Sequence, residues 1–123
     1  MKLASVRLVT SDVDRLAAFY SELTGVTPDR PSPAFANFRF GTAALAISSE
    51  QLVKQFNAGA AVAGQNRSAM IEFEVDDVDA VRTMLGAKAD CAMEPADMPW
   101  GNRSMLLRDP DGNVVNVFRR PAA

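Results

Sequence analysis

Two stretches of this chain alternate apolar with polar residues and then change to the spacing of a helix. In the first stretch Val6 and Leu8 alternate with polar positions, which is the period-2 pattern of a half-buried strand. The apolar residues then recur three and four positions apart, as they do along one face of an amphipathic helix. The pattern therefore predicts a strand followed at once by a helix. The helix positions are Val13, Leu16, Phe19, Tyr20 and Leu23.

The same pattern occurs a second time further along the chain. Ile71 and Phe73 alternate as the first strand does, and Asp12 and Asp77 stand just before the two helical stretches at an offset of 77 − 12 = 65 residues. An internal repeat of this length indicates two copies of one structural unit. The apolar helix positions of the second copy are Val78, Val81, Met84 and Leu85.

Each predicted helix is preceded by residues that are suited to capping it. Ser11 or Asp12 would cap the first helix and Asp76 or Asp77 the second, because their side-chain oxygens accept hydrogen bonds from free backbone N–H groups. We expect these acids to act as caps and not in catalysis. The helices are expected to end at Gly25 and Gly86, since glycine commonly follows a helix.

Further strands are predicted after each helix. In the first half two alternating runs flank a turn at Gly41, which is the pattern of a hairpin, and a weak edge strand precedes them. In the second half residues 90–98 are expected to form an irregular edge, and two strands flank a tight turn at 109–113. The hairpin and turn-flanking strands are predicted over residues 36–40, 44–48, 103–108 and 114–119.

The predicted fold class is therefore α+β, with two modules that each run strand, helix and then two or three strands. Module one covers residues 1–49, module two covers 68–120, and both lie in one domain, 1–123. Residues 50–67 are expected to link them, with a short helix followed by a flexible run rich in alanine and glycine. A mobile flap is the alternative interpretation of this segment.

Composition and charge narrow the classes of function. The 123 residues are 48% apolar and 23% charged, and the net charge is −2, which gives no broad positive field for nucleic acid or an anionic membrane. A single cysteine, Cys91, forms no internal disulfide, and the first residues carry no apolar signal core. These two features make a cytoplasmic location the expectation. No run approaches the roughly 18 apolar residues of a membrane span, so a soluble protein is expected.

Histidine is absent from the sequence. This absence removes the commonest nitrogen ligand of zinc, iron and nickel and the commonest general base near neutral pH. Nucleophiles activated by histidine are excluded. We expect no cofactor.

The run from Pro99 to Asn113 resembles a known family. Its Pro99-Trp100-Gly101 and Asp109-Pro110-Asp111-Gly112-Asn113 segments, taken with the 65-residue repeat, are similar to those of the vicinal oxygen chelate superfamily, which includes glyoxalases, bleomycin resistance proteins and extradiol dioxygenases. The resemblance implies two βαβββ modules that form a cupped, barrel-like mixed sheet with the helices outside. It also implies a ligand groove between the modules and, in many members, a homodimer.

Metal-using members of the family take one ligand from each of four strands. The resemblance carries these ligand positions to Ser5, Ala46, Met70 and Asn116. A hydroxyl, a methyl, a thioether and an amide do not suit zinc, iron or nickel, so no metal is expected. Two alternatives stay open, namely relocated metal ligands and a carboxylate-only site for a hard cation at Glu72 and Glu74.

The strand alternation also predicts which side chains line the groove. If Val6 and Leu8 face the helix, the alternate positions face the ligand. Glu72 is expected to pair with Arg7. Trp100 is expected either to stack on a planar ligand, as the resemblance implies, or to cover the edge of the core. The candidate ligand-binding residues are Ser5, Arg7, Asn37, Arg39, Met70, Glu72, Trp100, Asn116 and Phe118.

The leading hypothesis is a protein that binds a planar or amphipathic small molecule, an antibiotic or a metabolite, without metal and without catalysis. The resemblance to bleomycin resistance proteins implies sequestration of that molecule. The alternative is a lyase or isomerase in which Glu72 or Glu74 is the base and Arg7 or Arg39 stabilises developing negative charge.

Overall fold

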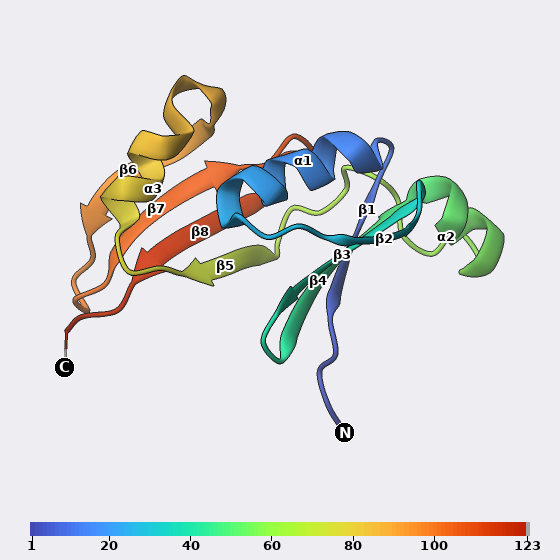
Figure 1. Cartoon of the computed structure of the whole chain (residues 1–123), viewed down its shortest axis with the longest axis horizontal. Coiled ribbons are helices and arrows are strands. Elements are labelled where there is room, and N and C mark those ends of the chain that lie inside the picture. Colours follow the sequence, from blue (N-terminus) through green and yellow to red (C-terminus); the bar gives the residue numbers. More distant parts are fainter. Residues whose placement is uncertain (123) are drawn as a thin grey trace. The chain divides into compact units, whose positions relative to one another are not determined.

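The computed structural model describes residues 1–122, which divide into two units between residues 65 and 66. Each unit contains one four-stranded sheet with parallel and antiparallel neighbours and a helix packed on it (Figure 1). The predicted α+β fold with two similar modules is confirmed. None of the helices within residues 1–122 has the length and apolar character needed to cross a membrane.

The first unit has the strand order β1-β4-β3-β2, in which β1 is parallel to β4 and the other neighbours are antiparallel. The predicted hairpin is β3 and β4, and the weak edge strand is β2. The segment after β4 begins with a short helix, as expected. The elements of this unit are β1 Val6–Thr10, α1 Val13–Thr24, β2 Asp29–Ser32, β3 Phe35–Phe40, β4 Ala43–Ser49 and α2 Glu50–Phe56.

The second unit repeats this topology with the order β5-β8-β7-β6, in which β5 is parallel to β8. The irregular edge predicted over 90–98 is β6, whose pairing with β7 shifts register twice. The elements of this unit are β5 Met70–Glu74, α3 Val78–Leu85, a 3-10 turn at Gly86–Lys88, β6 Asp90–Asp97, β7 Arg103–Arg108 and β8 Val114–Arg119.

The two helix starts show how closely the modules repeat. Asp12 has φ −144° and ψ 92°, and Asp77 has φ −143° and ψ 99°. Each aspartate accepts a hydrogen bond at 3.0 Å from the backbone N–H three residues later, at Arg15 and Ala80. Of the alternatives that the sequence left open, the caps are therefore Asp12 and Asp77. Glycine is the C-cap residue of both helices, as expected.

One face of the first sheet forms the core of its unit. Leu8, Ile47 and Ala36 lie side by side in one row across β1, β4 and β3, and all are buried. Helix α1 packs on this face, where the rings of Tyr20 and Phe38 lie 6.3 Å apart. Val6 shares this parity but is 51% exposed, because it begins the edge strand β1.

The core of the second unit is built in the same way. Met105 and Leu107 on β7 pair with Val117 and Val115 on β8, and all four are fully buried. Arg103 has the same parity on β7, and its guanidinium binds Asp79 of α3 with atom separations of 2.7 and 2.9 Å. This contact places α3 on the face that the four apolar residues occupy.

The segment after β4 is attached to the first unit by specific contacts. Ser49 caps α2, and Val53 is buried where α2 packs against β4 and β1. The Glu50 carboxylate accepts a 2.6 Å hydrogen bond from the Ala63 N–H. That bond lowers the pKa of Glu50, and the nearby Lys54 ammonium lowers it further.

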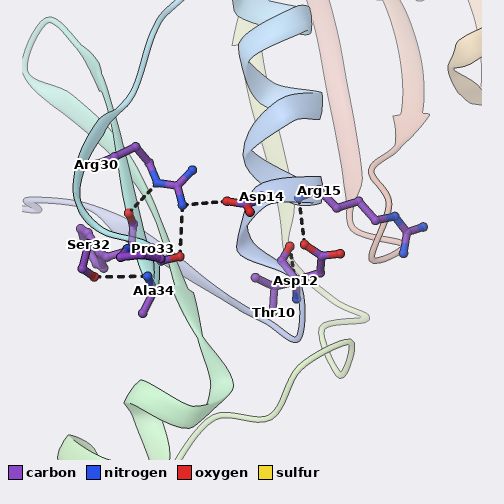
Figure 2. A network of polar contacts seen from close by, with 9 residues as sticks. Thr10, Asp12, Asp14, Arg15, Arg30, Ser32, Pro33 and Ala34 are labelled. Atoms are coloured by element: carbon purple, nitrogen blue, oxygen red, sulfur yellow. Dashed lines mark hydrogen bonds and ion pairs between the residues drawn. The ribbon is translucent and has the colours of Figure 1, made fainter.

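Arg30 holds the β2–β3 turn against the start of α1, as Figure 2 shows. Its guanidinium donates to the Asp14 carboxylate at 2.9 Å and to the backbone oxygens of Pro33 and Phe35 at 3.1 and 3.0 Å. Because Arg30 satisfies two carbonyl groups of the turn, it fixes the connection between β2 and β3.

The turn before β8 is organised around a buried carboxylate. Asp109 is only 4% exposed, and its Oδ1 accepts from the backbone N–H groups of Asp111 and Asn113 at 2.9 Å each. Its Oδ2 accepts from Asn113 Nδ2 at 2.7 Å, and Asn113 Oδ1 accepts from Asn66 Nδ2 at 2.9 Å. The carboxylate thereby orients the turn and links it to the residues before β5.

We predict that Asp109→Ala lowers the free energy of unfolding by about 2–4 kcal/mol, because it leaves buried N–H groups without their charged acceptor. Urea unfolding followed by circular dichroism measures this loss. Asp76→Ala, which removes an exposed acid from the same unit, is the control and should change stability by less than about 0.5 kcal/mol. Equal effects of the two substitutions would contradict the role given to Asp109.

Candidate functional site

The helix-distal face of the second sheet is the face that points away from α3. Neighbouring residues of a strand point to opposite faces, so the residues between the core positions lie on this face. Met70 is 49% exposed there, Glu72, Glu74 and Arg108 are exposed, Ser104 is buried, and the other side chains are half-buried. The helix-distal face is lined by Met70, Glu72, Glu74, Ser104, Leu106, Arg108, Val114, Asn116 and Phe118.

Glu72 and Asn116 form a polar pair in the middle of this face. They are register partners on β5 and β8, and Asn116 Nδ2 donates to Glu72 Oε2 at 2.8 Å. The amide oxygen of Asn116 is buried and has no hydrogen-bond partner among the described residues. A buried acceptor without a partner costs about 1–3 kcal/mol, so this oxygen marks a place where a donor is missing.

Glu74 lies at the end of the same strand in a different setting. Its carboxylate accepts from Arg120 Nε at 3.3 Å, and the Arg120 guanidinium lies 5.6 Å from the centre of the Phe118 ring. The charge of Glu74 is therefore compensated by a cation, which also covers an aromatic side chain. The two glutamates of β5 are not equivalent.

The face opposite α1 in the first sheet carries the candidates Arg7, Asn37 and Arg39. Arg7, Ala46 and Asn37 form one row across β1, β4 and β3. Arg7 donates to Asn57 Oδ1 at 2.8 Å, beyond the end of α2. Arg39 pairs with Asp29 at 2.9 Å on the neighbouring strand, and both side chains are mostly exposed, so this ion pair contributes little stability.

The predicted pair of Arg7 with Glu72 would join residues of two different units. Each of these side chains has a partner in its own unit, Asn57 for Arg7 and Asn116 for Glu72. The pairing between them stays a prediction.

Ser5 and Trp100 lie outside the strands. Ser5 is exposed and immediately precedes β1. Trp100 lies in the loop between β6 and β7 and is 67% exposed, so its indole does not cover the edge of the core. The next residue, Gly101, has φ +98°, and a Cβ there would meet Pro121 at 3.3 Å. Glycine is therefore required where the chain passes Pro121, and this fixes the loop beside Trp100.

The four positions that the resemblance assigns to metal ligands carry the wrong donors for zinc, iron or nickel. Ala46 presents a methyl group, Met70 presents a thioether, and the Asn116 amide nitrogen is bound to Glu72. Residues 1–122 hold no grouping of three or more histidine, cysteine or acidic side chains arranged for a metal ion. The donors present do not fit the family's metal centre.

Several contributors to the helix-distal face were missed by the sequence analysis, among them Leu106 and Arg120. Leu106 lies beside Asn116 across β7 and β8, and Arg120 reaches back from beyond β8. Ser104, Leu106 and Arg108 alternate with the core residues of β7, and this alternation could have predicted that Leu106 lies on the helix-distal face. No local pattern indicates the contact of Arg120, because its partner Glu74 is 46 residues away.

Cys91 lies outside the helix-distal face, since it pairs with the core residue Leu107. Burial raises the pKa of its thiol, and a hydrogen bond and the negative charge of Glu94 raise it further. Glu94 itself binds Arg82 of α3 at 2.6 Å, which lowers the pKa of that carboxyl group. Cys91 is therefore mostly protonated near neutral pH and is a poor nucleophile.

Comparison with known proteins identifies relatives over almost the whole chain. The family model described as the Glyoxalase/Bleomycin resistance protein/Dioxygenase superfamily matches residues 2–117. The uncharacterized protein YraH of Bacillus subtilis (strain 168) is 25% identical over 126 residues, which cover 97% of this chain and 98% of YraH.

Two solved structures are similar in fold. A glyoxalase-related enzyme from Fulvimarina pelagi superposes with a TM-score of 0.84 at 22% identity and covers 97% of this chain and 88% of its own. A glyoxalase/bleomycin resistance protein/dioxygenase from Nocardioides has a TM-score of 0.80 at 25% identity and covers 100% of this chain and 85% of its own. The sequence-based expectation of this superfamily is confirmed.

We predict that Cys91 reacts with iodoacetamide along a pH profile whose midpoint is higher than that of the same chain unfolded in urea. The raised thiol pKa leaves less thiolate at each pH, and the thiolate is the reacting form. In Glu94→Gln the midpoint should fall, because the carboxylate is removed while Arg82 remains. Mass spectrometry of the single alkylation gives the rates, and identical folded and unfolded midpoints would contradict the assignment.

Proposed function

Since this chain belongs to the glyoxalase/bleomycin resistance protein/dioxygenase superfamily, we propose that it binds a planar or amphipathic small molecule, without a metal, on the helix-distal face of the second sheet. One observation supports this most directly. Exposed or half-buried Met70, Leu106 and Phe118 lie on the same face as the polar pair of Glu72 and Asn116. Apolar area with a few polar anchors is the composition of a ligand-binding surface.

The chemistry of this face favours binding over catalysis. The sequence has no histidine to act as a base, and the one cysteine lies on the opposite face with a raised pKa. The Met70, Leu106 and Phe118 side chains would bury an apolar ligand surface, at roughly 25 cal/mol per Å². The biological role that fits is sequestration of an antibiotic or a metabolite.

An enzymatic function is the second candidate, and one observation favours it. The Glu72 carboxylate is exposed and is hydrogen-bonded to an amide and not to a cation, so it could take a proton from a bound substrate. Glu74 is less suited to this role, because Arg120 holds its carboxylate. In this case the chain would be a lyase or isomerase.

The remaining parts of the proposal concern assembly and location. We propose a homodimer, as the family resemblance implies, and a location in the cytoplasm, where a lone thiol such as that of Cys91 stays reduced. The first-unit residues Ser5, Arg7, Asn37 and Arg39 stay predicted contributors to ligand binding.

Native mass spectrometry should show a species of about twice the 13.2 kDa chain mass, since dimers are the commonest oligomers. This species should carry no added mass from zinc, nickel or iron, because the side chains at the ligand positions do not suit these metals. Samples from cells grown with each metal in excess provide the control. A stoichiometric metal, or a monomer at micromolar concentration, would contradict the corresponding part of the proposal.

A planar or amphipathic compound that binds this chain can be identified in an antibiotic panel by quenching of Trp100 fluorescence. We predict that this compound binds about 5- to 10-fold more weakly to Met70→Ala, because the variant loses apolar contact worth roughly 1 kcal/mol. Titration calorimetry measures the affinity. Met84→Ala is the matched control, since Met84 is similarly exposed at 55% but lies on α3, and it should bind as the unmodified chain does.

Mass spectrometry of the same mixtures separates the two candidate functions. An unchanged compound indicates a binding protein. A product that is formed by the unmodified chain and lost in Glu72→Gln, while calorimetric affinity is retained, would replace the binding role with catalysis.

A further inference from the structure

Helix α2 covers part of the first sheet on the face opposite α1. It packs against β4 and β1, and its Val53 side chain is only 1% exposed. The C-cap residue Asn57 accepts a hydrogen bond at 2.8 Å from Arg7, whose side chain points away from α1 because its neighbour Leu8 is in the core. This bond identifies the face of the sheet on which α2 lies.

The side chains of β4 on this face are smaller and more buried than those at the corresponding positions of β8. Ala46 and Ser48 correspond to Asn116 and Phe118, because the residues beside them on β1 and β5 are related by the 65-residue offset. Ala46 and Ser48 are 4% and 0% exposed, whereas Asn116 and Phe118 are half-buried. Within the described chain no helix follows β8. The small side chains of β4 leave room for a helix that the second unit lacks.

The segment after α2 forms a strap that returns to the first turn of the helix. The Ala63 N–H donates to the Glu50 carboxylate at 2.6 Å, and the Gly59 N–H donates to the Val53 carbonyl oxygen at 3.1 Å. Helix and strap are therefore tied to each other. We call them together the lid, which comprises residues 50–63.

Two features raise the free energy of the closed lid. Ser48 Oγ is buried and has no hydrogen-bond partner among the described residues, and a buried hydroxyl without a partner is destabilising. Ala58 has φ +56° and is the one non-glycine residue within 1–122 whose φ is positive, a conformation in which the Cβ is strained. The closed lid thus depends on the burial of Val53 and on the bond between Arg7 and Asn57.

We propose that the lid is a conformational device that opens as one cooperative unit while the sheet beneath it stays folded. Opening releases Arg7 from Asn57, gives the Ser48 hydroxyl access to water and lets Ala58 leave its left-handed conformation. Because a helix as short as α2 is not stable in water without packing, α2 and the strap lose their structure together. The open state presents Arg7 and Ser48 as hydrogen-bond donors. This inference is independent of the ligand proposed for the second sheet.

Two introduced thiols test whether the lid opens separately from the sheet. In a Cys91→Ser chain, Ser48→Cys places a thiol under the lid and Ala36→Cys places one in the core, both at positions with 0% exposure. Labelling with methyl methanethiosulfonate should be at least about 100-fold faster at position 48, since position 36 becomes accessible only when the sheet unfolds. Urea at low concentration should accelerate labelling more at position 36, because unfolding of the sheet exposes more surface. Equal rates at the two positions would overturn the proposal.

Two alanines of the strap give opposite expectations for the same substitution. Ala58→Gly removes the strain of the left-handed conformation, so labelling at position 48 should become about 3-fold slower. Ala61→Gly is the matched control, because Ala61 is exposed and its φ is not positive. Glycine there only adds freedom to the open state, and labelling should become about 2- to 3-fold faster. Changes in the same direction would contradict the coupling of Ala58 to the opening.

The contact with the sheet and the cooperativity of the lid are tested in the same variants. Asn57→Ala should accelerate labelling at position 48 about 3- to 5-fold, because the closed lid loses its bond to Arg7. Gln55→Ala removes another exposed amide of α2 and should change the rate by less than about twofold. Hydrogen exchange of the Gly59 and Ala63 amides should give the same opening constant as the labelling, within about threefold. Unrelated constants would overturn the single cooperative opening. Circular dichroism melting verifies that each variant is folded.

Discussion

The alternation of side chains along each strand is the constraint on which both units depend. In the second unit Val115 and Val117 must be buried under α3, so the residues between them necessarily point the other way. Asn116 stands on the helix-distal face because its neighbours belong to the core. The same rule places Arg7 opposite α1, since Leu8 is buried beneath that helix. Building the core thus determines which residues remain for other roles.

The two units keep one backbone plan but differ in the chemistry of these remaining positions. The helix caps Asp12 and Asp77 agree within a few degrees in φ and ψ, so the elements start in the same way. Five residues before each capping aspartate, however, the strand neighbours differ. Arg7 lies beside Ala46 in the first sheet, and Glu72 lies beside Asn116 in the second. Arg7 and Glu72 are both exposed, so their chemistry can change without loss of the fold.

Much of the fold was predictable from local sequence, because periodicity, caps and turn residues act over a few positions. The hairpin around Gly41, the strands beside the 109–113 turn and the family itself were all anticipated. The contacts of the candidate site were less predictable. The hydrogen bond between Asn116 and Glu72 depends on the register of strands 44 residues apart, and Arg7 bonds to Asn57 at a separation of 50 residues. Such partners depend on tertiary register, which the alternation of single strands does not encode.

The positions of the single tyrosine and the single tryptophan make it possible to observe whether the two units unfold independently. The chain has one tyrosine and one tryptophan; Tyr20 is fully buried in the first unit, and Trp100 belongs to the second. Each unit therefore carries its own spectroscopic reporter. Coincident denaturation curves from the two signals would mean that the modules unfold as one cooperative body, whereas separate curves would mean that they unfold as two.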